Sequence, residues 1–220
     1  MYGKLIAFEG IDGVGKDTQL KLLKEKLDSE SVKYKAVSFP RHNEPSAYFV
    51  DNYLSLNKPY GEAGELDAYQ ASVFYSLDRY DASFEIKKWL SGENLVIADR
   101  YTGSNIGHQG GKLNDEERKK FVDWLMDFEY RVLGIPKPAF SIILWLPIEV
   151  VQARINSRGR AKDGHEVNAD HLKKAQASYL WASKHYPEDF KVVKCFEEER
   201  ELNPQEVHEK VWKIVKDAIK

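Results

Sequence analysis

The sequence has little cysteine, no long apolar run and almost no net charge, and each shortage excludes a class of protein. Cys195 is the only cysteine in 220 residues, so no intramolecular disulfide can form, which suits a reducing compartment. The longest apolar run, residues 140–146, is far shorter than the roughly 20 residues that span a bilayer. A formal net charge of −2 gives no reason to expect nucleic acid as the main partner. We therefore expect a cytoplasmic protein that binds neither membrane nor nucleic acid.

The residues that are present form the pattern of a folded α/β domain. Apolar residues make up 42% of the chain and charged residues 31%, a balance that excludes intrinsic disorder. Five short apolar and β-branched runs, each typical of a strand buried on both faces, lie at residues 4–9, 35–39, 95–99, 140–146 and 191–196. Because helical patterns separate these runs, we predict a five-stranded parallel sheet with helices on both faces. No repeat or linker divides the chain, so one domain over residues 1–220 is expected.

Two of the helices can be located by periodicity and by their first residues. Apolar residues recur at steps of three and four over 121–132 and over 207–219, which predicts two amphipathic helices with their aromatic residues in the core. Asn114, with a glutamate three residues later, resembles a capping box. Asn203 followed by Pro204 places a cap residue before a proline at the first helical position.

A glycine-rich loop follows the first predicted strand. Residues 10–18 read Gly-Ile-Asp-Gly-Val-Gly-Lys-Asp-Thr and lead into a helix, which is the strand-to-helix context that gives the G-x-x-x-x-G-K pattern its meaning. The glycines let successive backbone N–H groups point at phosphate oxygens, and Lys16 is expected to reach the β and γ phosphates of ATP. The residues expected to bind this nucleotide are Gly10, Asp12, Gly13, Val14, Gly15, Lys16, Asp17 and Thr18, together with Arg154 from further along the chain.

One position departs from the standard loop. The residue after Lys16 is normally a Ser or Thr that ligates Mg²⁺, and here it is Asp17. A carboxylate is also a hard oxygen ligand for Mg²⁺, but it adds negative charge beside the triphosphate. Whether Asp17 binds the metal is therefore open, and Thr18 is a second candidate for contacting phosphate.

Three further motifs lie at workable spacing after the loop. Ser38-Phe39-Pro40-Arg41 ends the second strand, residues 75–79 read Tyr-Ser-Leu-Asp-Arg on a long helix, and Asp99-Arg100-Tyr101 closes the third strand. Together with the start of the glycine loop, these motifs resemble the thymidylate kinase family, and the bacterial form in particular, over the chain as far as Tyr179. The resemblance implies a P-loop kinase fold with a small mobile lid. It also implies transfer of the γ-phosphoryl group of MgATP to dTMP, giving dTDP and ADP.

The same motifs predict how the acceptor is held. Arg41 and Arg100 lie at the carboxyl ends of parallel strands, and a guanidinium fork suits a phosphate monoester. In the resembled family these positions hold the acceptor phosphate. Tyr75 and Arg79 are four residues apart on a helix, so the ring can stack on a pyrimidine while the arginine donates to a base carbonyl. The resemblance also gives Asp12 to the sugar 3′-hydroxyl and Asp99 to Mg²⁺ or its waters. The remaining acceptor residues that it implies are Phe39, Pro40, Ser104, Asn105 and His108.

His108 stands where the family usually has a tyrosine or phenylalanine, near the place of a 2′-hydroxyl. This substitution weakens any inference of strict deoxyribose selectivity.

The lid is expected at about residues 154–167. Arginines with glycines in a charged loop are typical of a mobile cover that brings positive charge to a migrating phosphoryl group. Gly13 lacks the arginine that would otherwise serve the transition state, which favours this role for the lid. The lid candidates are Arg154, Arg158 and Arg160, with Asp163 and Glu166 at acidic positions that the family uses for substrate. The predicted catalytic residues are Lys16, Asp99, Arg100, Arg158 and Arg160.

Three alternatives stay open at this point. A kinase of the same fold could act on dUMP, dCMP or a nucleoside. A P-loop switch protein could hydrolyse nucleotide slowly without an acceptor pocket, and an inactive kinase has Asp17 as its only support. The resemblance also implies a homodimer formed by helices beside the sheet, although the apolar helix faces are equally explained by the core.

Overall fold

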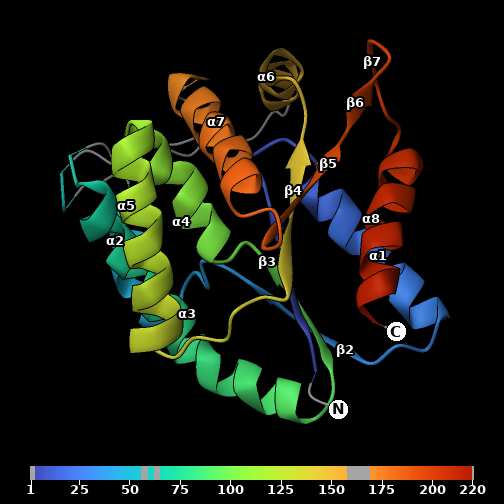
Figure 1. Ribbon diagram of the computed structural model, residues 1–220, viewed down its shortest axis with the longest axis horizontal. Coiled ribbons are helices and arrows are strands. Elements are labelled where there is room, and N and C mark those ends of the chain that lie inside the picture. The colour runs from blue at the N-terminus through green and yellow to red at the C-terminus, as the bar shows by residue number, and fades with distance from the viewer. Residues whose placement is uncertain (1–2, 56–58, 62–64, 158–168, 220) are drawn as a thin grey trace.

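The computed structural model describes residues 3–55, 59–61, 65–157 and 169–219. Its centre is a parallel sheet in the order β2-β3-β1-β4-β5, which confirms the predicted five strands (Figure 1). The strands are β1 Leu5–Glu9, β2 Tyr34–Ser38, β3 Leu95–Asp99, β4 Phe140–Trp145 and β5 Phe190–Lys194. The helices are α1 Lys16–Ser29, α2 Tyr48–Leu54, α3 Ala68–Ser91, α4 Thr102–His108, α5 Asp115–Met126, α6 Ile148–Ser157, α7 Ala169–His185 and α8 Pro204–Ala218.

The sheet is covered on both faces, as predicted. In Figure 1, α1 and α8 lie on one side of the sheet and α3, α4, α5 and α7 on the other. Every residue of β1 is buried, and neighbouring residues of the strand face opposite layers. Ile6 packs in the cluster that contains Leu23 of α1, whereas Leu5 packs with Ile86 of α3. This burial on both faces explains why β1 reads as a continuous apolar run rather than an alternating one.

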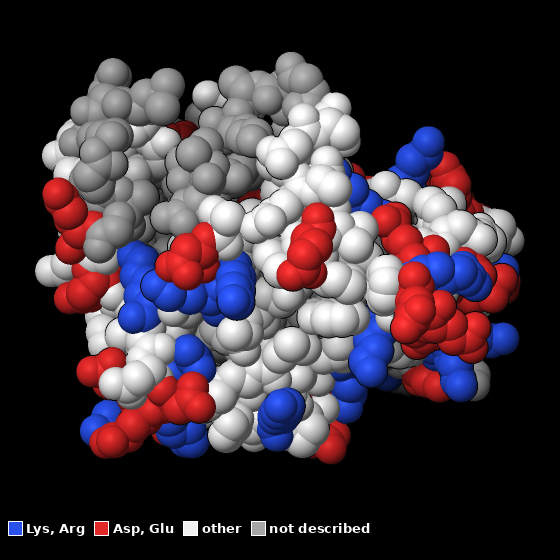
Figure 2. Space-filling model, turned by 90° about the horizontal axis from the view of Figure 1, so that it is seen from above, with Lys and Arg blue, Asp and Glu red and all other residues white. Residues whose placement is uncertain are grey.

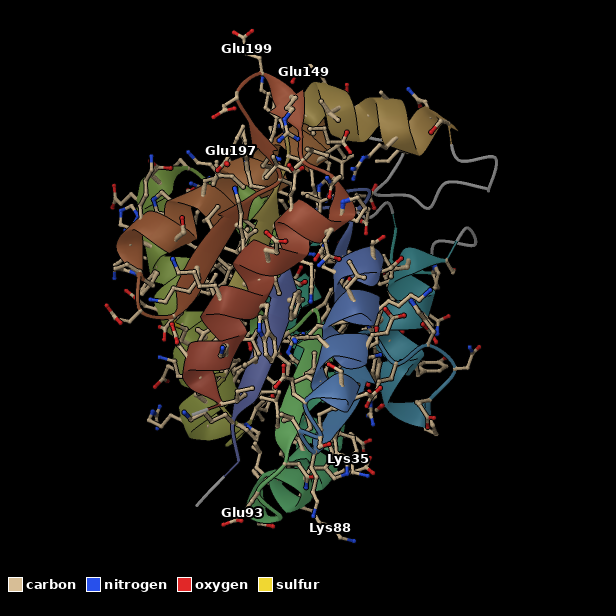
Figure 3. All side chains as sticks on the ribbon, turned by 90° about the vertical axis from the view of Figure 1, so that its right-hand side faces the viewer. Lys35, Lys88, Glu93, Glu149, Glu197 and Glu199 are labelled. Carbon is tan, nitrogen blue, oxygen red and sulfur yellow. The ribbon has the colours of Figure 1, made fainter. Side chains whose placement is uncertain are left out.

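The prediction that all five strands are buried on both faces is wrong at both edges of the sheet: β5 is only partly buried, and β2 is more open still. Its five residues are half-buried or exposed, because β2 is an edge strand with only β3 beside it. Lys35, labelled in Figure 3, lies on this strand and is exposed. A charged residue on an edge strand discourages pairing with another chain.

The helix predicted over 121–132 changes its winding before it ends. The α-helix α5 stops at Met126, and residues Asp127–Val132 form a π-helical turn in which the N–H of Leu133 donates to the carbonyl of Phe128 at 2.9 Å. Val132 is consequently 56% exposed rather than part of the core. The first residues of both predicted helices are confirmed, since Asn114 and Asn203 each accept from backbone N–H groups in a complete capping box.

A short hairpin was not predicted. Strands β6 Phe196–Glu197 and β7 Arg200–Glu201 pair antiparallel after β5. The labelled Glu197 and Glu199 of this hairpin lie near Glu149 of α6, at the opposite end of the molecule from Glu93 (Figure 3). Cys195, just before the hairpin, is buried.

Within the described part of the chain, no helix combines the length and apolar character that crossing a bilayer requires.

Candidate active site

A cavity of about 250 Å³ lies at the carboxyl ends of β1, β2 and β3, which is where parallel α/β sheets bind ligands. Loops after these strands and three helices, α2, α3 and α4, contribute its walls. Its lining residues are Asp12, Ser38, Phe39, Pro40, His42, Leu54, Tyr75, Asp99, Arg100, Ser104, Asn105, His108 and Gln109. Most of the predicted acceptor residues are therefore brought together around one space.

The glycine loop curls beside this cavity as the sequence predicts. Gly10, Gly13 and Gly15 have φ angles of 134°, 83° and 105°, a region that only glycine adopts without strain. At Gly10 a side chain is also excluded by space, because a Cβ would lie 2.9 Å from the carbonyl oxygen of Leu144. Val14 is buried beneath the loop, and Asp17 and Thr18 are exposed in the first turn of α1. Helix α1 begins at Lys16, with Gly15 as its N-cap, so its N-terminus lies directly at the end of the loop.

Lys16 is buried and folded back on the loop. Its Nζ donates to the carbonyl oxygens of Gly10 at 3.1 Å and Ile11 at 3.3 Å, and lies 3.8 Å from Asp12. Burial lowers the pKa of Lys16 to about 8, helped by the nearby charge of Arg100 and opposed by Asp12. The ammonium is therefore mainly charged at neutral pH, and its partners among the described residues are two carbonyl oxygens and one carboxylate.

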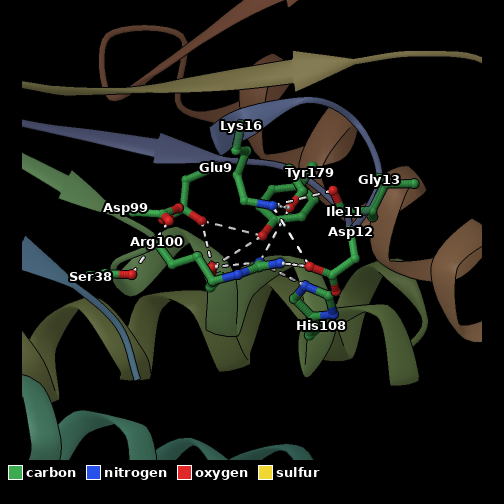
Figure 4. A network of polar contacts seen from close by, with 12 residues as sticks. Glu9, Ile11, Asp12, Gly13, Lys16, Ser38, Asp99, Arg100, His108 and Tyr179 are labelled. Carbon is green, nitrogen blue, oxygen red and sulfur yellow. Dashed lines mark hydrogen bonds and ion pairs between the residues drawn. The ribbon is translucent and has the colours of Figure 1, made fainter. Parts of the chain in front are cut away.

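Arg100 faces the glycine loop. Its backbone has φ 62°, an uncommon value for a residue with a side chain, and its N–H donates to Phe8 of β1 at 2.9 Å. The guanidinium donates to the carbonyl oxygen of Gly10 at 3.2 Å and forms an ion pair with Asp12 (Figure 4). Burial opposes ionisation of both side chains, but their mutual attraction outweighs it, so the pKa of Asp12 is lowered and that of Arg100 raised. A fixed cation thus lies between the cavity and the phosphate loop.

Arg41 does not line the cavity. Its Nε donates to Asp78 at 2.9 Å and its Nη2 donates to Asp81 at 2.6 Å and to Ser46 at 2.6 Å. The two aspartates lie on α3 next to the predicted base-reading residues, so Arg41 fastens the strand end to that helix. Its role in holding the acceptor phosphate stays a prediction.

The two residues predicted to recognise the base lie in different environments. Tyr75 lines the cavity, with its ring in edge contact with Tyr53 at 6.2 Å between centroids. Arg79 is fully buried below it, with its guanidinium bound to Glu129. Tyr75 therefore faces the cavity, whereas Arg79 lies in the interior and is bound by Glu129.

His42 lines the cavity but was not predicted as a site residue. Its Nδ1 lies 2.5 Å from the carboxylate of Asp51 in α2, which also accepts from the backbone of Asn43 at 3.0 Å. This contact orients the imidazole at the mouth of the cavity. The available signal was its position, because His42 directly follows the Phe39-Pro40-Arg41 motif at a strand end.

His108 and Ser104, on α4, both contact Arg100. The Nη1 atom of Arg100 lies 3.2 Å from Nε2 of His108 and 3.3 Å from Oγ of Ser104. Because arginine only donates, Nε2 of His108 is the accepting nitrogen in this contact. The other ring nitrogen lies 3.1 Å from His171 of α7. His108 is thus part of the frame around Arg100 as well as of the cavity wall.

Glu9 is the buried residue that joins these side chains, and no role is predicted for it from the sequence. Its carboxylate accepts from Ser104 at 2.6 Å, from the backbone of Tyr101 at 2.9 Å and from Tyr179 at 3.3 Å (Figure 4). Burial raises the pKa of Glu9 from 4.5 to about 7, although these contacts and Arg100 favour the charged form.

The raised pKa of Glu9 predicts a pH-dependent stability. The unfolded chain releases this proton near pH 4.5 and the folded chain near pH 7, so the stability conferred by Glu9 is complete below about 4.5 and lost above about 7. The loss across this window is about 3 kcal/mol. In Glu9→Gln, the free energy of unfolding measured in urea from pH 4.5 to 7 should fall less than in the unchanged protein. Equal falls in the two proteins would show that Glu9 does not titrate in this range.

Asp17 and Asp99 line a second cavity, of about 370 Å³, that runs along α1. The Oδ1 atom of Asp99 is buried and has no hydrogen-bond partner among the described residues, while its other oxygen lies 3.4 Å from Ser38. Both predicted metal ligands therefore face a common space, and one of them has an unused acceptor.

The first lid arginine reaches the glycine loop. Arg154, near the end of α6, donates to the carbonyl oxygen of Gly13 at 3.1 Å and forms an ion pair with Glu201 of the hairpin. The other lid residues predicted to act, Arg158, Arg160, Asp163 and Glu166, lie outside the described residues.

Charges of both signs share the face above the carboxyl ends of the strands. Figure 2 shows Lys and Arg side chains interspersed with Asp and Glu over this face. This face is therefore not uniformly basic. Positive charge at the site comes from three side chains that contact the glycine loop, those of Lys16, Arg100 and Arg154.

The sheet is parallel and carries a phosphate loop after β1, and Arg100 lines the cavity and is directed at that loop. These features define the chain as a P-loop kinase of nucleoside monophosphates. The family model for thymidylate kinase matches residues 8–211. The chain therefore belongs to the thymidylate kinase family.

Individual relatives agree with this assignment. The chain is 30% identical to thymidylate kinase of Mycobacterium tuberculosis over 80% of this chain and 83% of the relative. It is 34% identical to a probable thymidylate kinase of Saccharolobus solfataricus over 93% of this chain and 95% of the relative. The solved structure of thymidylate kinase from Candida albicans matches with a TM-score of 0.72 at 24% identity, covering 99% of this chain and 92% of that one, which supports the fold.

Proposed function

We propose that the 250 Å³ cavity is the dTMP site of this kinase and that the glycine loop is its ATP site. The activity of the family, phosphorylation of thymidylate with ATP, is the activity of this chain. The observation that carries the placement is the contact of Arg100 with both sites, since it lines the cavity and donates to the carbonyl oxygen of Gly10. A phosphate bound to Arg100 would thus lie beside the loop that holds the donor.

The transfer that this arrangement supports is in-line and has no covalent intermediate. An oxygen of the acceptor phosphate attacks the γ-phosphorus, the bond to the β–γ bridging oxygen breaks, and ADP leaves. When ATP binds, Lys16 would leave the loop carbonyl oxygens and contact the β and γ phosphates. Arg100 would likewise leave Asp12 and contact the acceptor phosphate. Asp12 would then be available to the sugar 3′-hydroxyl.

Calorimetric titration tests the acceptor site. We expect dTMP to bind more tightly than dUMP, which lacks the methyl group, and TMP to report how far His108 relaxes selection against a 2′-hydroxyl. Equal affinity for dTMP and inorganic phosphate would contradict the placement, because Phe39 and Tyr75 would then contribute nothing.

His42 is proposed as a further contact for the acceptor phosphate. It lines the cavity, and its orientation depends on Asp51, whereas the guanidinium of neighbouring Arg41 is bound by aspartates.

Asp51→Asn is therefore expected to raise the KM for dTMP about three- to five-fold without changing the KM for ATP. An effect of this size corresponds to the loss of roughly one weak hydrogen bond. Steady-state assays with each substrate varied in turn would measure this. Asp127→Asn, which changes a surface carboxylate paired with Arg131, is the matched control. A KM for dTMP that stays the same in Asp51→Asn would remove His42 from the site.

Magnesium is proposed at Asp99 and Asp17. Carboxylate oxygens suit Mg²⁺, and the buried Oδ1 of Asp99 has no hydrogen-bond partner within the described ranges. No three acidic, histidine or cysteine side chains gather in the described part of the chain, so the nucleotide phosphates would supply most of the ligands. When bound, Mg²⁺ would neutralise charge on the β and γ phosphates.

Removing one of these carboxylates should raise the metal requirement. Asp99→Asn is expected to need about ten-fold more Mg²⁺ for half-maximal rate, measured by titrating the metal at fixed ATP. An unchanged requirement would assign the metal to the phosphates and Asp17 alone.

The lid is proposed to follow the bacterial pattern, with Arg158 and Arg160 adding positive charge at the migrating phosphoryl group. Arg154 supports this reading because it already contacts Gly13, where no arginine is present. Separate Arg158→Ala and Arg160→Ala variants test it, since a loss in kcat with unchanged KM values is expected from at least one of them.

A homodimer and a cytoplasmic location also stay proposals. The exposed rings of Tyr80 and Phe84 on α3 offer apolar surface to a second copy, and sedimentation at several protein concentrations would reveal the dimer. The location is supported by the single, buried Cys195, and cell fractionation tests it.

A further inference from the structure

Glu129 is the most enclosed carboxylate whose purpose the reaction does not explain. It is 0% exposed and accepts four hydrogen bonds. Oε1 accepts from Ser76 at 2.7 Å and from Nη2 of Arg79 at 2.5 Å, and Oε2 accepts from Nε of Arg79 at 3.0 Å and from Thr102 at 2.6 Å. Every acceptor position of the carboxylate is therefore used.

The sequence position of Glu129 is unusual for a charged residue. It lies four residues after Leu125 and eight after Phe121, both fully buried, so it continues the apolar face of α5. It also lies in the π-helical turn Asp127–Val132, a form of winding that is rare and often found at functional sites. The free-energy cost of burying a carboxylate at such a position must be offset by specific hydrogen-bond partners.

Stability alone does not account for this ion pair. Taking Glu129 and Arg79 out of water costs several kcal/mol, and well-packed apolar side chains of similar volume often replace such pairs without loss. What the pair does supply is geometry. A bidentate carboxylate fixes the plane of the guanidinium, which a flexible partner or an apolar neighbour cannot do.

The elements joined by Glu129 are two of the three helices that line the acceptor cavity. Ser76 and Arg79 belong to α3, whose Tyr75 lines the cavity, and Thr102 begins α4, whose Asn105 lines it. One carboxylate thus sets both the spacing of these helices and the orientation of Arg79.

Arg79 retains unused donors. Glu129 takes its Nε and Nη2, whereas no described residue accepts a hydrogen bond from Nη1, although the side chain is only 2% exposed. The guanidinium also lies 6.0 Å from the centre of the Tyr101 ring, which limits its movement further. An oriented N–H group for which no described residue is the acceptor can donate to a carbonyl oxygen of a ligand.

We propose that Glu129 is a positioning residue for recognition of the acceptor base. It holds Arg79 so that Nη1 is presented to a carbonyl oxygen of the pyrimidine stacked on Tyr75, and this inference rests on the proposed dTMP site. The group recognised is the 4-oxo group of thymine or uracil, because an arginine N–H can donate to an oxo group but not to the 4-amino group of cytosine.

The test compares dUMP with dCMP as acceptors, since these differ at the 4-position and share sugar and phosphate. The unchanged enzyme should favour dUMP over dCMP in kcat/KM by ten-fold or more. Glu129→Gln places an amide donor against the donors of Arg79 or Thr102, so this preference should shrink about ten-fold. The KM for ATP and the preference for dTMP over dUMP, which depends on the methyl group, should stay within two-fold.

Two more variants keep the test decisive. Thr102→Val is nearly isosteric and removes one of the four hydrogen bonds, so it should fold and should reduce the dUMP preference about three-fold, even if Glu129→Gln unfolds. Glu116→Gln, at an exposed carboxylate of α5, is the matched control and should change nothing. An equal loss on dUMP and dCMP in the variants would indicate a merely structural role and overturn the proposal, as would no preference in the unchanged enzyme. Failure of the unchanged enzyme to phosphorylate dTMP would instead refute the proposed function.

Discussion

Lys16→Ala is expected to lower kcat by about 10³-fold or more while the protein stays folded. Lys16 is the side-chain cation of the glycine loop placed to meet the β and γ phosphates, and its present partners are only carbonyl oxygens and Asp12. Its loss leaves the charge that spreads over the γ-phosphoryl group without this compensation. A coupled assay of ADP release at saturating MgATP and dTMP measures the effect.

The control for this variant is a surface lysine that lines neither cavity. Lys120 of α5 has a side chain that is 69% exposed and paired with Glu116, so Lys120→Ala should keep the unchanged turnover. Thermal unfolding of both variants separates a loss of catalysis from a loss of folding. Turnover near that of the unchanged enzyme in Lys16→Ala would refute its role at the donor phosphates.

Arg100→Gln is expected to reduce kcat/KM for dTMP by about 10²- to 10³-fold. Arg100 is the guanidinium that lines the acceptor cavity and also donates to the carbonyl oxygen of Gly10. A glutamine keeps a hydrogen-bond donor but removes the charge that a phosphate monoester requires. The effect should be concentrated in the acceptor, so the affinity for ATP measured by calorimetry should change by much less.

Arg131→Gln is the comparison for this second variant, because Arg131 is a surface residue with its side chain 73% exposed and paired with Asp127. Arg100→Gln also leaves Asp12 with Lys16 as its remaining nearby cation, so a modest loss of stability is expected alongside the kinetic one. If dTMP and ATP lost affinity equally, Arg100 would be part of the frame rather than of the acceptor site.

The fold and the donor loop could be predicted because their signals are local. A continuous apolar run such as that of β1 is required by burial on both faces, and the three glycines of the loop are required by its φ angles. Arg100 was also within reach, since a residue at the carboxyl end of a central strand must face the ligand edge of the sheet.

The contacts of Arg41 could not be predicted from its neighbours in the sequence. It too follows a strand, but its guanidinium is bound by Asp78 and Asp81, which are 37 and 40 residues further along the chain. Only the packing of the segment after β2 against α3 brings these carboxylates to it. The exposure of β2 has the same origin, because a strand's place at the edge of a sheet depends on how the whole sheet is ordered.

Glu129 and His42 were missed for different reasons. His42 adjoins a recognised motif, and its tie to Asp51 depends on how α2 packs. Glu129 did leave a sequence signal, a carboxylate on the apolar face of a predicted helix, but the π-helical turn that accompanies it is not visible in the periodicity. An acidic residue at a core position of an amphipathic helix therefore indicates a buried cation elsewhere in the chain.

The account depends most on the claim that the two phosphate sites face each other across Arg100 and the glycine loop. The direct measurement is product analysis after incubation with MgATP, with and without dTMP. We predict one dTDP formed for each ADP, and little ADP when dTMP is absent. ADP released at the same rate in both samples, without dTDP, would contradict the account.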